Sequence, residues 1–583
     1  MSNAGASQTI LPKPYVSRVL EPAIAQAASS RLVERIWAKD ASLWTSDPAA
    51  QQHIGRRLGW LTILDVMAQR ADEVIAFAQE IRQAGFTHAL LLGMGGSSLF
   101  SEVCRFTFGT ADGWLDLTVM DTTDPTAIQA AQQRVPMQKT LFIVSSKSGS
   151  TTESSALCDY FYDQIRQIKN DNKAGEQFIA ITDAGTSLEA LAKERRFRRA
   201  FVHGPGTGQE VGGRFSGVTY FGMVPAALQG VDVKQLISRG QQMLKACGAT
   251  VPAVENPALA LGLLLAESAK LGRDKMTLLS AGSLGKFGVW VEQLIAESVG
   301  KSGKGIIPVD NEPPKSPTAY PKDRVFIELQ LANELDAKHA EALIEQGHPV
   351  VRLHLKDRYD LGAEVMRWFL ATATCAAAMG VNAFDEPNVQ ESKDRTKALL
   401  ERYVKEGSLP VGQPLFNDQG ISVFGQPPAV SGDSVESALR RLIKQAKLGD
   451  YLAICSFLPR TVALDRTVQA LHRALSERLE IAVTLGFGPR YLHSTGQLHK
   501  GGPDKVLLLF LTSEDLVDLP IPGKPYGFGI LKQAQALGDL QALQERKRRV
   551  IRLHLGNAPE RGMDRLRSIV DQIVRLAAAK LTR

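Results

Sequence analysis

Residues 141–154 read LFIVSSKSGSTTES, and the hydroxyl-rich second half of this segment could bind an anion. We expect its apolar start to be a strand of a parallel sheet, because continuous apolar strands of this kind are covered on both faces. Parallel sheets bind their ligands at the carboxyl ends of their strands. The candidate ligand-binding residues there are Ser146, Lys147, Ser148 and Thr151. A capped helix after a flexible turn is the alternative that this segment alone leaves open.

A helix is expected to begin at the end of this segment. Ser150 and Glu153 have the spacing of a capping box. The apolar residues that follow have helical spacing: Leu157, Tyr160, Phe161, Ile165 and Ile168. The N-terminus of a helix favours an anion, because its N–H groups are free and the helix dipole is positive there.

A second glycine- and serine-rich turn occurs in LLLGMGGSSLF, residues 90–100. GMGGS differs from the GxGxxG pattern of dinucleotide-binding folds, and Asp121 lies too far along the chain to be the acidic residue of that fingerprint. Two such turns in one domain favour a compact monophosphate over a dinucleotide.

Residues 286–309, KFGVWVEQLIAESVGKSGKGIIPV, contain a candidate general base. Gln293 and Glu297 are four residues apart, so they lie on the same face of the expected helix. Glu297 borders the apolar stripe and sits in the last helical turn, where the dipole disfavours a carboxylate. A carboxylate destabilised in this way suits a general base. The alternative is a solvated glutamate at a helix end.

Two basic residues are further catalytic candidates. Arg214, in VGGRFSG (211–217), follows two glycines at an expected domain junction and could stabilise an oxyanion. Lys393, in NAFDEPNVQESK (382–393), could donate a proton to a sugar oxygen. A surface lysine is the alternative for Lys393.

These segments must be positioned by alternating strands and helices, which predicts the α/β class with parallel sheets covered on both faces. The predicted strands are 87–93, 114–121, 141–146, 177–183, 275–282, 325–331, 349–355, 450–457, 479–486, 505–512 and 550–556.

The order of the elements predicts three α/β blocks after an N-terminal segment. Residues 1–55 are expected to be helical or irregular, 56–215 to form the first unit, 216–408 the second and 409–583 the third. The Pro/Gly-rich passage 408–432 is expected to be a linker or an edge crossover.

Composition excludes several classes of protein. The net charge is +7 over 583 residues, and the sequence contains no run of five or six like charges. This mild positive charge favours small anionic ligands over nucleic acid. Five scattered cysteines lack the spacing of a disulfide framework or zinc site, so we expect a cytoplasmic protein. No apolar run is long enough for a membrane span, and no signal peptide is expected.

Five motifs, in chain order, resemble the glucose-6-phosphate isomerase family: GMGGS, SSKSGSTTES, VGGRFSG, QLIAES and FDEPNVQESK. The resemblance covers roughly residues 85–395. Two later segments, LGFGPRYLHSTGQLHKGGP (485–503) and DLPIPGKPYGFG (518–529), are similar to the isomerase half of bifunctional transaldolase/phosphoglucose isomerases. No region resembles the transaldolase barrel, so the isomerase alone is expected.

The resemblance implies two sugar-isomerase (SIS) domains that build one site, without a metal or redox cofactor. It assigns Arg214 to the region of the enediolate, Gln293 to substrate contact, and Glu297 to proton transfer between C1 and C2. It assigns Lys393 to ring opening. The residues that match phosphate-binding positions are Gly96, Ser97, Ser146, Lys147, Ser148 and Thr151.

The chain departs from the family pattern at two points. The family's FDQ is FDE here, with Glu386 in place of the glutamine. A histidine for ring opening is expected after the QxxxE segment, and none lies near it. We hypothesise that His493 or His499 supplies this group, with His499 preferred; a basic surface loop is the alternative.

Three hypotheses of function follow. The first is interconversion of glucose 6-phosphate and fructose 6-phosphate through a cis-enediolate. The second is a non-catalytic SIS-type sensor of sugar phosphates, and the third is an isomerase for mannose 6-phosphate or another aldose. The resemblance also implies a homodimer and a functional link to transaldolase.

Overall fold

A computed structural model describes residues 7–169, 171–204, 210–334, 337–425 and 433–581. The chain divides into two compact units. The first consists of Met1–Asp121, Ala131–Asp310 and Lys322–Asp385. The second consists of Thr122–Ala130, Asn311–Pro321 and Glu386–Arg583.

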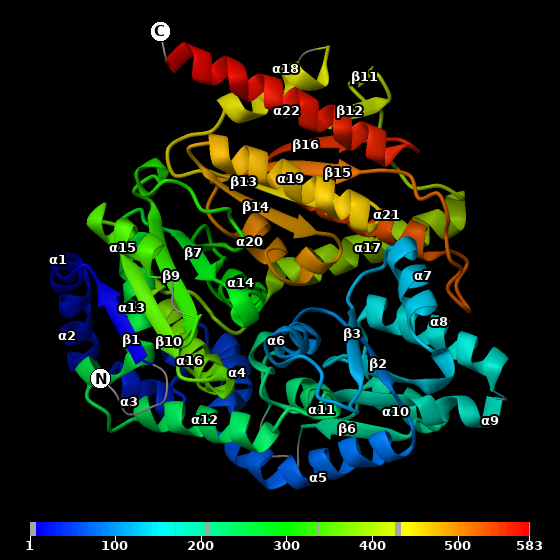
Figure 1. Cartoon of the computed structure of the whole chain (residues 1–583), viewed down its shortest axis with the longest axis horizontal. Coiled ribbons are helices and arrows are strands. Elements are labelled where there is room, and N and C mark those ends of the chain that lie inside the picture. Colours follow the sequence, from blue (N-terminus) through cyan, green and yellow to red (C-terminus); the bar gives the residue numbers. More distant parts are fainter. Residues whose placement is uncertain (1–6, 170, 205–209, 335–336, 426–432, 582–583) are drawn as a thin grey trace. The chain divides into compact units, whose positions relative to one another are not determined.

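The first unit contains a wholly parallel sheet of five strands in the order β3-β2-β4-β5-β6. Its strands are β2 (His88–Gly93), β3 (Asp116–Met120), β4 (Thr140–Ser145), β5 (Phe178–Asp183) and β6 (Arg199–His203). The central strands β2, β4 and β5 are largely apolar and almost fully buried, as a sheet covered by helices requires, and the edge strands β3 and β6 are only partly buried. The helices of this region are α5 (Ile63–Gln83), α6 (Leu99–Phe108), α8 (Thr152–Ile168), α10 (Ser187–Glu194) and α11 (Tyr220–Leu228) (Figure 1).

A second five-stranded sheet of the same unit has the order β1-β10-β9-β7-β8. Only β1 runs antiparallel to its neighbour; the other strands are parallel. The strands are β1 (Ser7–Leu11), β7 (Lys275–Ser280), β8 (Ile307–Val309), β9 (Arg324–Leu331) and β10 (Val350–Leu355). The helices of this region are α12 (Val233–Ala246), α13 (Pro257–Lys270), α14 (Phe287–Val299) and α16 (Leu361–Met379). Helix α14 contacts β7 and β8, and α12, α13 and α14 all pack on α16.

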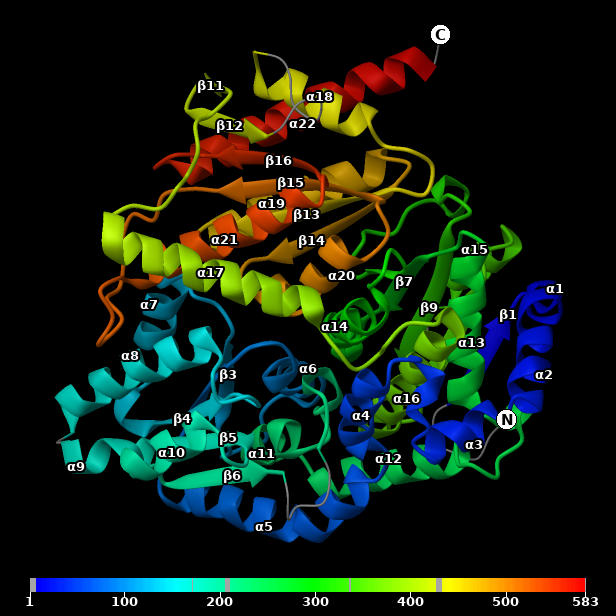
Figure 2. The same ribbon diagram turned by 180° about the vertical axis from the view of Figure 1, so that it is seen from behind.

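The second unit contains a six-stranded sheet in the order β11-β12-β16-β15-β13-β14. The strands are β11 (Phe416–Asp418), β12 (Ile421–Gly425), β13 (Tyr451–Phe457), β14 (Ala482–Phe487), β15 (Val506–Thr512) and β16 (Arg549–His554). Helices α18 (Val435–Lys444), α19 (Val462–Arg478) and α22 (Pro559–Leu581) lie on one face. Helices α17 (Pro387–Glu406), α20 (Gly496–Gly501) and α21 (Phe528–Glu545) lie on the other (Figures 1 and 2).

The α/β class is confirmed, and all eleven predicted strands are present within a few residues of their expected ends. Five further strands escaped prediction: β1, β6, β8, β11 and β12. Each lies in a short or weakly apolar segment at or near a sheet edge. Of the passage 408–432, β11 and β12 form the antiparallel edge of the third sheet, and residues 426–432 lie outside the described residues.

The predicted boundaries after residues 55, 215 and 408 stay a proposal. Within the N-terminal segment, β1 pairs with β10 and so adds an edge strand to the second sheet. Helices α2 (Glu21–Ser29), α3 (Leu32–Trp37) and α4 (Pro48–Arg57) follow it.

The capping box predicted at Ser150 is wrong. Helix α8 begins at Thr152, so Thr151 is the N-cap residue, and no side chain caps this end. The Ser150 hydroxyl instead donates to Ser148 Oγ at 3.1 Å. The stripe on α8 is buried as expected except at Ile168, which is 43 % exposed because it ends the helix.

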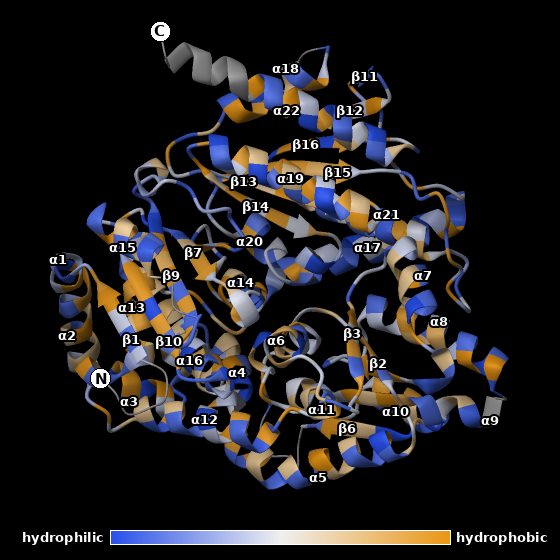
Figure 3. Ribbon diagram, in the orientation of Figure 1, coloured by the Kyte–Doolittle hydropathy of each residue, from blue (hydrophilic) through white to orange (hydrophobic). Residues whose placement is uncertain are grey.

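The hydrophobic strands and the apolar helices α13 and α16 stand out in Figure 3. Over the described part of the chain, every helix is either too short or too polar to cross a bilayer.

Candidate functional site

The glycine-rich loop after β2 packs tightly against the loop that carries Arg214. Gly95–Ser97 forms one 3-10 turn, η4, and Gly213–Phe215 forms another, η7. A Cβ atom at Gly96 would lie 2.0 Å from the Gly213 carbonyl oxygen, so only glycine fits there. The Ser216 hydroxyl lies 3.2 Å from the Gly96 carbonyl oxygen, which ties the two loops together.

The loop after β4 holds its hydroxyl groups at the N-terminus of α8. Ser146 Oγ lies 2.9 Å from Thr151 Oγ1, and Ser146 is buried. Gly149 has a φ of +67°, and a Cβ atom there would meet the Thr186 side chain at 2.5 Å. Ser148 is exposed. Uncapped by any side chain, this helix end can offer N–H groups to an anion.

The two loops adjoin one another, because β2 and β4 are neighbours in the sheet. Ser145 Oγ donates to the Ser97 carbonyl oxygen at 2.7 Å. The six residues expected to bind phosphate therefore lie on two adjacent loops at the carboxyl edge of one parallel sheet.

Lys147 forms an ion pair that sequence reasoning did not include. Its Nζ atom lies 2.5 Å from Asp183 Oδ2, and Asp183 ends the neighbouring strand β5. Burial raises the pKa of Asp183, and the charge of Lys147 partly opposes this rise. His203, which ends β6, is buried 3.9 Å from Asp183 Oδ1. Burial and then the Lys147 charge lower the pKa of His203 to about 4.

Asp183 could have been found from the strand pattern, because it ends the predicted strand next to β4 and such ends gather at one edge of a parallel sheet. His203 could not have been found in this way, because it ends β6, which was not predicted.

The guanidinium group of Arg214 is buried and makes contacts on several sides. Its Nε atom donates to Ser298 Oγ at 2.8 Å, and Nη1 lies 3.5 Å from Glu297 Oε2. Nη2 donates to the carbonyl oxygens of Ala383 and Asp385, the latter at 3.0 Å. Arg214 thus joins helix α14 to the segment 382–385, which begins the stretch NAFDEPNVQESK.

Glu297 is buried and not a solvated helix-end residue. It is 5 % exposed, and nearly every residue of α14 is buried with it. The amide nitrogen of Gln293 lies 3.4 Å from Glu297 Oε1. The carboxylate is therefore held between Gln293, one turn earlier on the helix, and Arg214.

Lys301 is a second buried cation near this helix, and the sequence analysis missed it. Its Nζ atom donates to the carbonyl oxygens of Asn382 and Asp385 at 2.5 and 2.6 Å, and contacts Asp385 Oδ1 at 2.7 Å. Lys301 and Arg214 together hold the segment 382–385 in place. A lysine directly after Gly300, the C-cap residue of α14, is a signal that could have indicated it.

The motifs of the first unit converge through these contacts. Helix α14 packs against η4 and η7, so Glu297, Arg214 and Gly96 belong to one continuous set of elements. The arrangement offers a carboxylate, a fixed guanidinium and an anion-binding edge, which suits a proton transfer on a phosphorylated substrate.

Lys393 belongs to the second unit. It is exposed on the first half of α17, and Glu386, the N-cap residue of that helix, makes no side-chain cap hydrogen bond.

His499 and His493 also belong to the second unit, and their surroundings differ. His499 lies on α20 between the rings of Tyr451 and Tyr491, with centroids 6.2 and 6.0 Å away. Burial, together with the charges of Lys500 and Arg548, lowers the pKa of His499 to about 3. His493 is only half-buried, at the end of a 3-10 turn. An imidazole that burial keeps neutral is a weak proton donor, and His499 is enclosed by two aromatic rings, so the surroundings favour the half-buried His493 for that role.

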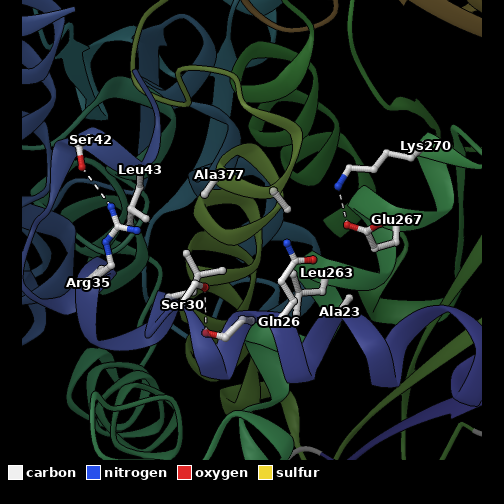
Figure 4. Close-up of a pocket in the computed structure, with 13 residues that line it drawn as sticks. Ala23, Gln26, Ser30, Arg35, Ser42, Leu43, Leu263, Glu267, Lys270 and Ala377 are labelled. Atoms are coloured by element: carbon white, nitrogen blue, oxygen red, sulfur yellow. Dashed lines mark hydrogen bonds and ion pairs between the residues drawn. The ribbon is translucent and has the colours of Figure 1, made fainter. Parts of the chain in front are cut away.

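A separate cavity of about 310 Å³ in the first unit is lined by residues of α2, α3, α13 and α16. In Figure 4, Lys270 points to Glu267 and Arg35 points to Ser42, at 2.6 and 3.1 Å. Each of its charged side chains thus already has a polar partner. None of its lining residues belongs to the five motifs.

In the described residues, no three His, Cys, Asp or Glu side chains gather closely enough to hold a metal ion. All five cysteines are buried with free thiols.

Comparison with known proteins finds similar proteins over part of the chain. Residues 63–310 match the family model described as phosphoglucose isomerase. A glucose-6-phosphate isomerase of Synechococcus sp. (strain JA-3-3Ab) is 27 % identical over 361 residues, 54 % of this chain and 66 % of the relative. A probable glucose-6-phosphate isomerase of Methanococcus maripaludis is 25 % identical over 374 residues, 58 % of this chain and 83 % of the relative. The chain thus spans slightly less than two thirds of the Synechococcus relative.

Two solved structures share the fold. A hypothetical protein from Thermus thermophilus matches 67 % of this chain and 99 % of its own, with a TM-score of 0.55 and 22 % identity. A glucose-6-phosphate isomerase from Chlamydia trachomatis matches 69 % of this chain and 90 % of its own, with a TM-score of 0.53 and 17 % identity.

The resemblance to the glucose-6-phosphate isomerase family, expected from the motifs, is confirmed by the family model and these relatives. The finer resemblance to bifunctional transaldolase/phosphoglucose isomerases stays a prediction.

Proposed function

We propose that this chain, which matches the phosphoglucose isomerase family over residues 63–310, interconverts glucose 6-phosphate and fructose 6-phosphate. The observation that carries the proposal is the buried carboxylate of Glu297, held by Gln293 and Arg214 beside the loop of Gly96. A phosphate-binding edge alone would serve many proteins. A buried, restrained carboxylate opposite a guanidinium group is what an aldose–ketose isomerisation requires.

In this proposal, Glu297 accepts the C2 proton of the open-chain aldose. The electrons of the broken C–H bond form the C1–C2 double bond of a cis-enediolate, and the carbonyl electrons move to O1. Arg214 stabilises the negative charge on that oxygen. The protonated Glu297 then returns the proton to C1, the C2–O2 bond becomes the ketone carbonyl, and the O2 proton passes to O1, which becomes the C1 hydroxyl.

The phosphate group would bind at the edge formed by Gly96 and Ser97 of one loop and by Ser146, Ser148 and Thr151 of the next. Lys147 would move its charge from Asp183 to the phosphate. The uncapped end of α8 supports this placement, because its N–H groups are oriented towards the same loop.

A coupled isomerase assay with the purified chain, run on glucose 6-phosphate and mannose 6-phosphate, tests the function. Turnover of glucose 6-phosphate supports the proposal, and turnover of mannose 6-phosphate alone supports the third hypothesis. Binding of either sugar phosphate without turnover would instead support the sensor. The buried Glu297–Gln293–Arg214 arrangement favours an enzyme over a sensor, since a sensor needs the phosphate loops alone.

We expect Lys147→Ala to raise KM for glucose 6-phosphate about 10- to 100-fold, with a smaller change in kcat. A hydrogen bond to a charged group contributes roughly 1.5–3 kcal/mol. Steady-state kinetics measures both constants. Lys139→Ala is the matched control, because Lys139 is exposed just before the opposite end of β4. Equal constants for Lys147→Ala and the wild type would remove Lys147 from the phosphate site.

Ring opening is assigned to Lys393 and to a histidine of the second unit, with His493 now preferred. We expect His493→Gln to slow anomer exchange of the sugar phosphate about 10²-fold, the lower range for general acid–base catalysis. Exchange is measured by NMR on the equilibrated sugar phosphate. His499→Gln is the comparison variant. If neither substitution changes exchange or turnover, the missing group lies elsewhere.

We also propose a homodimer that acts in the cytoplasm, with a functional link to transaldolase. The family resemblance supports the homodimer and the link to transaldolase. The cysteines, which are buried with free thiols, support the cytoplasm.

A further inference from the structure

The second unit contains a cavity at the carboxyl ends of β13, β15 and β16. Its volume is about 330 Å³, a size suited to a small molecule. Phe457, Thr512 and His554, the last residues of these three strands, line it. The opposite wall is the first half of α21. The chain passes from β13 to β14 on one side of it and then returns to β15 on the other side. The strand order therefore reverses between β13 and β15, and such a topological switch point is where α/β sheets bind ligands.

Arg552 lines this cavity and lacks an anionic partner. It is 4 % exposed, and within the described residues it forms no ion pair. Its Nη2 atom donates to the Val411 carbonyl oxygen at 2.8 Å, and its Nε atom makes no hydrogen bond. The guanidinium carbon lies 3.7 Å from the ring centroid of Phe424, which fixes its plane. A buried cation without a counter-charge is costly, and an anionic ligand would supply the missing charge.

The carboxylates nearest to the cavity are already engaged or exposed. Asp515 is paired with Lys532, which also contacts Asp124 Oδ2 at 2.8 Å. Asp518 Oδ1 accepts the N–H group of Gly529 at 2.6 Å. Glu514 is exposed at the cavity. None of these three carboxylates pairs with Arg552 in the described residues. They can instead accept hydrogen bonds from hydroxyl groups of a ligand.

Two further groups fit an anion at this place. The Ser513 hydroxyl lines the cavity and has no hydrogen-bond partner. Burial, and then the Arg552 charge, lower the pKa of His554, so this histidine is neutral and adds no competing cation. Burial likewise lowers the pKa of Arg552 to about 10, which leaves it charged at neutral pH.

We propose that this cavity is a second ligand site, which binds a small hydroxylated metabolite with one phosphate or carboxylate group. Arg552 binds the anionic group bidentately, Ser513 donates to it, and Glu514 and Asp515 accept hydroxyl protons of the ligand. The site belongs to a different unit from Glu297. The proposal does not depend on the isomerase activity, because binding itself is measured.

Titration calorimetry on the full chain tests the site with three probes: inorganic phosphate, glycerol 3-phosphate and gluconate. We expect at least one probe to bind the wild type at a site whose affinity falls at least about tenfold in Arg552→Gln, because a charge-assisted hydrogen bond is lost. Binding of glycerol 3-phosphate over gluconate assigns a phosphate, and the reverse assigns a carboxylate. Arg466→Gln is the matched control, because Arg466 is exposed in the same unit.

Thermal unfolding of the ligand-free variants separates a binding role from a structural one. If Arg552 serves to bind a ligand, the ligand-free Arg552→Gln variant should have the same Tm as the wild type or a higher one, because the substitution removes an uncompensated buried charge. Should Arg552→Gln fail to fold, Ser513→Asp serves instead: it places a carboxylate in the cavity and should abolish binding. The proposal is overturned if neither Arg552→Gln nor Ser513→Asp weakens the binding of any probe. It is also overturned if Arg552→Gln lowers Tm and the wild type binds none of the probes.

Discussion

Glu297→Gln should lower kcat for glucose 6-phosphate about 10²- to 10⁴-fold, the range that general base catalysis contributes. The substitution keeps the size of the side chain and its place between Gln293 and Arg214. It removes the carboxylate that we propose accepts the C2 proton. The coupled assay measures kcat, and a phosphate-containing competitive inhibitor measures whether the phosphate edge still binds.

Proton exchange gives a sharper test of the same residue. In the wild type, the C2 proton of the substrate should exchange with deuterated solvent during turnover, and Glu297→Gln should lose turnover and exchange together. Glu292→Gln is the matched control, because Glu292 lies on the same helix and is only half-buried. If Glu297→Gln retains exchange at the wild-type rate, another residue is the base.

The fold was predictable where a single physical rule dominates. Strands such as β4 and β15 are continuous apolar runs, and a covered parallel sheet leaves few other places for them. Strand β1 could not be predicted in the same way. Its residues SQTIL are partly exposed, and it is a strand because it pairs with β10, whose residues lie more than 300 positions later in the chain.

The candidate site was predictable as a set of motifs but not as a set of contacts. Glu297 was selected for its unfavourable place at a helix end, and the structure adds what offsets that cost: the guanidinium of Arg214 at 3.5 Å. Lys301 and Asp183 act through partners distant in sequence, the segment 382–385 and Lys147. No local sequence pattern predicts such pairs. Only the rule that parallel strands end at one edge of the sheet indicates that Asp183 lies near Lys147.

The basic loop of the second unit shows how a motif can serve the fold. Lys500 comes from LGFGPRYLHSTGQLHKGGP, and its Nζ atom lies 2.5 Å from Asp539 Oδ1 with both side chains fully buried. The Tyr491 hydroxyl, from the same motif, donates to Asp539 Oδ2 at 2.8 Å. This carboxylate joins η12 (Arg490–His493) and α20 to α21.

Asp539→Asn should therefore destabilise the second unit by about 3–5 kcal/mol, because it leaves the Lys500 ammonium buried without its charge partner. Denaturant unfolding of the full chain, followed by a probe in the second unit, measures the loss. Removing both charges, as Lys500→Met with Asp539→Leu, should recover much of it, since a buried pair replaced by apolar residues is often neutral.

Glu406→Gln is the matched control for this pair. Glu406 lies 2.7 Å from Arg402 on α17, but each side chain is 51 % exposed, so the loss should stay below about 1 kcal/mol. Similar losses for Asp539→Asn and Glu406→Gln would mean that water reaches Lys500. In that case the motif is better explained by a site that solvent and substrate can enter than by the packing of α20 on α21.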